Sequence, residues 1–80
     1  MEKNMEKITT NITTEYIKLD QLLKFTSVAE SGADAKDMIL SDMALVNGEP
    51  CAMRGKKIRA GDIVTVMFED ETVEISVGEK

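Results

Sequence analysis

The chain has 80 residues, of which 42% are hydrophobic and 31% charged, a composition that predicts a single small folded domain and not a disordered chain. It carries one cysteine and no histidine, which excludes an intramolecular disulfide, a Cys/His zinc site and His-based catalysis, so we expect no metal, no cofactor and no enzyme. The formal net charge is -5, the N-terminus is polar, and no apolar run approaches the ~20 residues of a membrane span, so we expect a cytoplasmic protein that does not engage membranes.

The first fourteen residues are polar and rich in Thr and Asn. They predict a flexible N-terminal lead-in over residues 1–14, although β-branched Thr could also extend a strand there. The folded domain is then expected over residues 15–80. Residues 15–18 predict a short strand, with Tyr16 and Ile17 as its apolar members.

Two short helices follow. Asp20 is a favourable N-cap, and the first helix is expected to end at about Thr26. Its apolar face is formed by Leu19, Leu22 and Leu23. Ser31 and Asp34 have the spacing of a capping box, which predicts a second helix that ends near Ser41. Its apolar face is formed by Ala35, Met38 and Ile39.

The second half of the chain predicts strands. Residues 43–46 are apolar, and Asn47-Gly48 is a strong hairpin signal. The return strand is expected over residues 49–53, with an edge or a break in pairing at Pro50. After a Gly61-Asp62 turn, a strand over residues 63–68 and an alternating strand follow. The alternating apolar residues are Val73, Ile75 and Val77. Two helices beside three or four antiparallel strands indicate an α+β domain. Met38, Met43 and Met53 are expected in its core, and Cys51 half-buried.

Four of the ten Lys and Arg residues fall within six positions, which we call the basic segment (residues 54–59). Its cations are Arg54, Lys56, Lys57 and Arg59. A local excess of positive charge in an acidic chain indicates a polyanionic partner, with a solvated loop as the alternative. Ile58 is expected to anchor the segment in the core. Residues 60–80 contain six acidic side chains and one Lys, so that end is expected to face away from the polyanion.

Five short sequences stand out along the chain, and they are I-K-L-D-Q-L-L-K at 17–24, S-G-A-D-A-K at 31–36, L-V-N-G-E at 45–49, R-G-K-K-I at 54–58 and G-D-I-V at 61–64. In order and spacing they resemble the S4 RNA-binding domain, and in particular the small stand-alone S4 proteins of bacteria. The resemblance implies the S4 (αL-type) fold, in which two short helices pack on a small antiparallel sheet. It also implies non-catalytic binding of structured ribosomal or transfer RNA, in ribosome assembly or rescue.

The same resemblance assigns RNA contact to further residues outside the basic segment. They are Lys18, Lys24, Ser31, Gly32 and Lys36. Ser31 and Gly32 start the second helix, where free N–H groups favour an anion, although Ser31 can also be a plain cap. Many S4 domains have an arginine where this chain has Gly32, and glycine is frequent there in the stand-alone subgroup. With three aromatic residues in the chain, shape and phosphate recognition is expected to outweigh base stacking.

Two other functions fit parts of the sequence. One is a protein-interaction adaptor that docks on a ribosome or an enzyme. A β-grasp sulfur carrier is the other, because such proteins share V-N-G-E and a later G-D-x-V, although this chain ends Gly78-Glu79-Lys80 instead of in a diglycine. The partners expected are RNA and the ribosome, with the protein itself a monomer.

Overall fold

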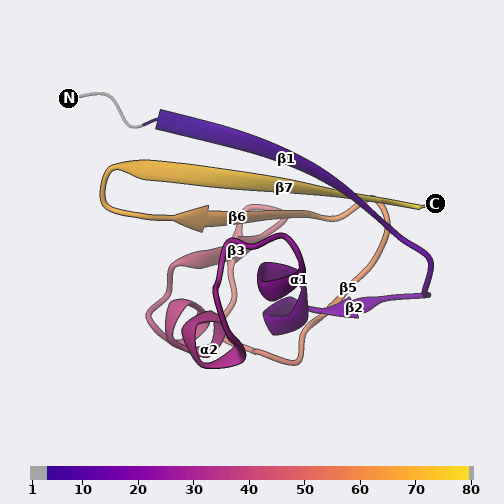
Figure 1. Cartoon of the computed structure of the whole chain (residues 1–80), viewed down its shortest axis with the longest axis horizontal. Coiled ribbons are helices and arrows are strands. Elements are labelled where there is room, and N and C mark those ends of the chain that lie inside the picture. Colours follow the sequence, from indigo (N-terminus) through magenta and orange to yellow (C-terminus); the bar gives the residue numbers. More distant parts are fainter. Residues whose placement is uncertain (1–3, 80) are drawn as a thin grey trace.

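The computed structural model describes residues 4–79, and within them the chain forms two helices, a five-stranded sheet and a separate two-stranded ribbon. The helices are α1 (Leu19–Phe25) and α2 (Gly32–Leu40). The sheet order is β1 (Asn4–Ile12), β7 (Glu71–Glu79), β6 (Ile63–Met67), β3 (Ala44–Val46) and β4 (Glu49–Pro50). The ribbon pairs β2 (Ile17–Lys18) with β5 (Lys57–Ile58). Figure 1 shows both helices on one side of the sheet, with the ribbon beside α1, which confirms the α+β class.

Strand β1 differs from the flexible lead-in expected over residues 1–14. Residues 4–12 form a strand that runs parallel to β7, with Asn4 aligned with Glu71 and Ile12 with Glu79. Ile12 is buried and Ile8 packs against the core, so this strand adds apolar surface to the sheet. The other pairs in the sheet are antiparallel, as expected, so β1 makes the sheet mixed. Residues 1–3 and 80 lie outside the described residues.

The start of α1 also differs from the expectation. Lys18, and not Asp20, is the N-cap, and its side chain makes no capping hydrogen bond. The backbone N–H groups of Leu19 and Asp20 instead donate to the carbonyls of Lys56 (2.9 Å) and Arg54 (3.1 Å). Because the basic segment supplies these acceptors, no side-chain cap is needed for those two groups.

The predicted cap of α2 is confirmed: Ser31 Oγ accepts a hydrogen bond from the Asp34 backbone N–H at 3.2 Å. This bond satisfies one of the donors that a helix leaves free in its first turn. The side chain of Ser31 therefore acts as the N-cap that the capping-box spacing predicts.

The core lies between the helices and the sheet. Its largest fully buried side chains are Leu19, Leu22, Leu23, Ile39, Ile58, Val64, Val66 and Ile75. The alternation predicted for the last strand is confirmed, since Val73, Ile75 and Val77 are all buried. Within residues 4–79, no helix is both long and apolar enough to cross a membrane.

The segment after β4 is less regular than expected. Strand β4 ends at Pro50, and one further backbone hydrogen bond joins the Cys51 N–H to the Ala44 carbonyl at 3.0 Å, whereas the sequence predicts a return strand over residues 49–53. Because the chain leaves the sheet after Cys51, Met53 is 65% exposed, and the expectation that it belongs to the core is wrong. Cys51 is half-buried, as expected, and packs against the core.

Candidate nucleic-acid interface

One buried side chain anchors the basic segment in the core. Ile58 is fully buried and pairs with Ile17 of β2, whereas the four cations of the segment are exposed. This confirms Ile58 as the expected anchor. An isolated two-residue pairing contributes little stability, so the burial of Ile58 against the core is what fixes the position of the surrounding cations.

The ribbon brings two predicted RNA-binding residues together. Lys18 of β2 lies directly opposite Lys57 of β5 in the antiparallel register, and both are exposed. Side chains directly opposite in such a pair lie close together, and like charges there are destabilising. The arrangement concentrates positive charge on one face of the ribbon, which favours an anion that bridges the two ammonium groups.

Tyr16 is a neighbour of this pair that sequence reasoning placed only as an apolar strand residue. The Lys57 ammonium lies 4.9 Å from the centroid of the Tyr16 ring. Such a cation–π contact restrains the lysine side chain without neutralising its charge. In the sequence, Tyr16 stands out as an aromatic residue close to Lys18, but no local pattern indicates that its ring contacts Lys57.

The backbone of the basic segment is tied to α1. The carbonyls of Arg54 and Lys56 accept the first N–H groups of the helix, as described above, and the Lys56 N–H donates to the Met53 carbonyl at 3.2 Å. The segment is thus a turn joined to a helix start and not a free loop. Cations on such a backbone lose less conformational entropy on binding than cations on a mobile loop.

The far end of the basic segment is fixed by Asn47 and Asp62. The Asp62 carboxylate accepts hydrogen bonds from the Arg59 backbone N–H (2.8 Å) and from Asn47 Nδ2 (3.1 Å). Asn47 Oδ1 accepts from the Ile63 N–H at 2.9 Å. Asn47 has φ 52°, the left-handed conformation that its predicted turn requires. We call these bonds the Asn47–Asp62 clasp, which links the β3–β4 turn to the basic segment.

The clasp has an electrostatic consequence. The hydrogen bond from the Arg59 backbone lowers the pKa of Asp62 below its ordinary value, and the Asn47 amide and the charges of Arg59 and Lys56 act in the same direction. Partial burial opposes them. Asp62 is therefore ionised at neutral pH and engaged by donors. Sequence reasoning had given Asn47 and Asp62 only turn roles.

The remaining predicted residues lie on the helices. Lys24 is in the last turn of α1 and Lys36 is on α2, and both are exposed. The Ser31 hydroxyl is occupied as a cap, and a Cβ added at Gly32 would meet nothing within 4 Å. Since α1 and α2 pack against each other, these residues belong to one helical layer. Of the predicted RNA-contact residues outside the basic segment, Lys18 on β2 is the one that the structure places directly beside that segment.

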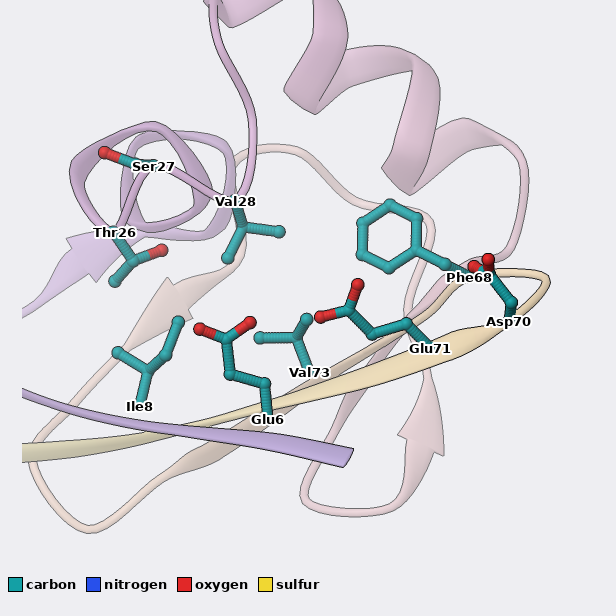
Figure 2. Close-up of a pocket in the computed structure, with 9 residues that line it drawn as sticks. All are labelled: Glu6, Ile8, Thr26, Ser27, Val28, Phe68, Asp70, Glu71 and Val73. Carbon is teal, nitrogen blue, oxygen red and sulfur yellow. The ribbon is translucent and has the colours of Figure 1, made fainter. Parts of the chain in front are cut away.

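The acidic part of the chain lies elsewhere. The β6–β7 turn, which carries Glu69 and Asp70, is at the opposite end of the long axis of the molecule from the β2–β5 ribbon (Figure 1). Figure 2 shows a cavity next to this turn into which the carboxyl groups of Glu6 and Glu71 point, below Thr26 and Val28. A hydrogen bond with Glu6 raises the pKa of Glu71, and burial and the charges of Glu6 and Asp70 add to this effect.

Comparison with known proteins finds a family whose model matches the sequence of this chain. The family model of the S4 domain matches residues 10–76, which include both helices, the ribbon and the clasp. The chain belongs to the S4 domain family. A "probable ribosome maturation protein RlbA" of Bacillus subtilis (strain 168) is 43% identical over 56 residues, which cover 70% of this chain and 79% of that protein. The S4 match begins within β1, so residues 4–9 of that strand precede it.

Proposed function

We propose that this protein binds structured RNA without catalysis and acts in the maturation or assembly of the ribosome. Membership of the S4 domain family and similarity to a Bacillus subtilis protein named as a probable ribosome maturation protein support the proposal. The observation that carries it is the placement of Lys18 opposite Lys57 on a ribbon that the basic segment extends. A phosphate bound between the two lysines would relieve their mutual repulsion, which supports this surface as the binding site.

The chemistry of the surface favours phosphate recognition over base stacking. Arg54 and Arg59 can bind phosphate oxygens in a bidentate manner, whereas Lys56 and Lys57 act as point charges. Tyr16 already contacts Lys57 and is not a free stacking platform. A surface of this kind suits the regular phosphates of a folded RNA, ribosomal or transfer, and Lys24 and Lys36 on the helical layer can extend it.

The ribbon can be tested by removing one of its charges. We expect Lys57→Ala to weaken binding to a purified ribosomal RNA fragment and to reduce the slope of log affinity against log salt by about 0.7–0.9. Lys7→Ala is the matched control, since Lys7 is exposed on β1, away from the ribbon. Equal affinity and equal slope for both variants would remove the ribbon from the interface.

The two other functions make different predictions. A protein-interaction adaptor would show no salt-dependent binding to RNA. A sulfur carrier needs a flexible diglycine, whereas Gly78 lies within β7 opposite Asn11, whose side chain occupies the space where a Cβ would stand. This glycine therefore has a packing role in the sheet. A thiocarboxylate detected by mass spectrometry would nevertheless favour the carrier.

A further inference from the structure

A groove lies between the β3–β4 hairpin and the basic segment, with an open volume of about 590 Å³. Its apolar lining is formed by Val46, Pro50, Cys51 and Met53. Its cations are Lys56, Lys57 and Arg59. The volume falls within the range of about 300–1,000 Å³ that is typical of small-ligand sites. An apolar wall beside three cations suits a ligand that is both flat and anionic.

Met53 is the unusual member of this lining. Its apolar side chain is 65% exposed, and it directly precedes the basic segment in the chain. The Lys56 N–H donates to its carbonyl, so the turn holds Met53 beside the basic segment. Apolar surface that stays in water next to binding cations gains free energy when a ligand covers it. A methionine suits this role because its thioether is polarisable and adapts to the face of a ring.

The polar groups of the groove leave its cations available. Asp62 is engaged by the Arg59 backbone and the Asn47 amide, so its charge is held at one end of the groove. Glu49 is the second carboxylate of the lining. Three cations against two carboxylates leave the groove net positive, in contrast to the chain as a whole. The charge therefore complements a phosphodiester more than a basic or neutral ligand.

We propose that this groove binds one unstacked nucleotide of the RNA, with the base against Pro50 and Met53 and the adjoining phosphates on the cations of the groove. The proposal rests on the proposed function and specifies its ligand. A base enters such a groove only when it leaves the helix, which is easy in bulges and loops of folded RNA. The preferred RNA is accordingly a helix interrupted by an extruded nucleotide, and not a continuous duplex.

The test compares two RNA hairpins that have the same stem, one with a single bulged nucleotide and one without. By fluorescence anisotropy, the wild type is expected to bind the bulged hairpin about four- to tenfold more tightly, the ratio that covering much of one exposed methionine supplies. Met53→Ser is expected to abolish this preference, so that the variant binds the two hairpins with equal affinity. Met5→Ser is the matched control, because Met5 is 57% exposed on β1.

The possible outcomes separate the two proposals. Equal affinity of the wild type for both hairpins, or a preference that survives Met53→Ser, would overturn the nucleotide site and leave the RNA-binding proposal standing. Binding of neither hairpin would overturn both. A photoactivatable 4-thiouridine at the bulge gives a second measurement: cross-links to the 49–53 segment are expected, and cross-links confined to α1 and α2 would contradict the assignment.

Discussion

At the residue scale, the positions that organise the candidate interface are not all basic. Asn47 and Asp62 join the β3–β4 turn to the end of the basic segment through three side-chain hydrogen bonds. A single hydrogen bond of this kind contributes about 1 kcal/mol. Because these bonds converge on the Arg59 backbone and the start of β6, their loss would loosen the cations together with the turn.

Removing the Asp62 carboxylate tests the clasp. We expect Asp62→Ala to lower the free energy of unfolding by about 1–2 kcal/mol at neutral pH, as measured by chemical denaturation. The pKa of Asp62 is lowered in the folded state, so its contribution is present above the ordinary carboxyl pKa and is lost as the pH falls through the lowered value. The difference between variant and wild type should shrink accordingly in acid.

Asp37→Ala is the control for charge, since it removes an exposed carboxylate from α2. Its effect on the free energy of unfolding is expected to stay within about 0.5 kcal/mol. An Asp62→Ala variant as stable as this control at neutral pH would show that the clasp has no energetic role.

Individual residues show what the sequence could predict about the site. The cations, the Ser31 cap and the Ile58 anchor follow from local patterns, namely charge, capping spacing and a lone apolar residue in a polar run. Tyr16 and Asp62 act on residues that lie far along the chain, such as Lys57 and Asn47, and no local pattern encodes such partners. Met53 fits a core pattern by composition and is exposed because its strand ends at Pro50.

At the element scale, strand β1 is the main addition to the expected fold. Its sequence alternates weakly, with Ile8 and Ile12 on the core side and Thr10 between them, and this favoured a flexible interpretation. Parallel pairing with the last strand joins residues 67 positions apart, as the alignment of Ile8 with Ile75 shows. A pairing across that separation depends on the assembled sheet and has no signal in the residues of β1 alone.

Hydrogen exchange tests this strand directly. Amides that bond along the β7 side should be protected, in an alternating pattern over residues 4–12, because strand residues present every second N–H to a given neighbour. If all amides in this range exchange at the rate of an unstructured peptide, the expectation of a flexible N-terminal segment is correct and the strand does not persist in solution.

The Glu6–Glu71 pair between β1 and β7 gives the sheet a pH dependence. Since the pKa of Glu71 is raised, the folded state holds its proton more tightly than the unfolded state, so stability falls as the pH rises from the ordinary glutamate pKa through the raised value. Glu71→Gln should remove this decline and be more stable than wild type at neutral pH, in thermal unfolding followed from acid to neutral pH.

Glu15→Gln is the control for that substitution, because Glu15 is exposed and lies outside the pair. It removes the same charge and should leave the pH dependence of the melting temperature as in the wild type. If both variants show the wild-type profile, the two carboxyl groups do not interact in solution.

At the scale of the whole molecule, charge is separated along the long axis, with the basic ribbon and the acidic β6–β7 turn at opposite ends (Figure 1). Glu69, Asp70 and Glu71 place three carboxylates at this turn, in a chain whose net charge is -5, and such a cluster is expected to repel RNA. We propose that this arrangement orients RNA towards the basic segment and limits non-specific contact. The charge asymmetry was visible in the sequence, whereas its placement at two ends required the fold.

Neutralising the acidic end tests this orientation. Replacing Glu69, Asp70 and Glu71 by their amides should raise affinity for random-sequence RNA, because the repulsion that discourages non-specific contact is removed. The measurement is filter binding at low salt, with Glu15→Gln as the control for an added amide. Unchanged binding to random RNA would show that the acidic end has no such role.

The most direct test of RNA binding through the basic segment is a salt titration of wild type beside a variant in which Arg54, Lys56, Lys57 and Arg59 are all changed to Glu. With about four phosphates contacted, raising the salt from about 50 to 200 mM should weaken binding of the wild type to structured ribosomal RNA roughly 50- to 150-fold. The variant should keep the fold by circular dichroism and lose binding at both salt concentrations. A folded variant that retains wild-type affinity, or a wild type whose affinity does not change with salt, would contradict the assignment of the interface.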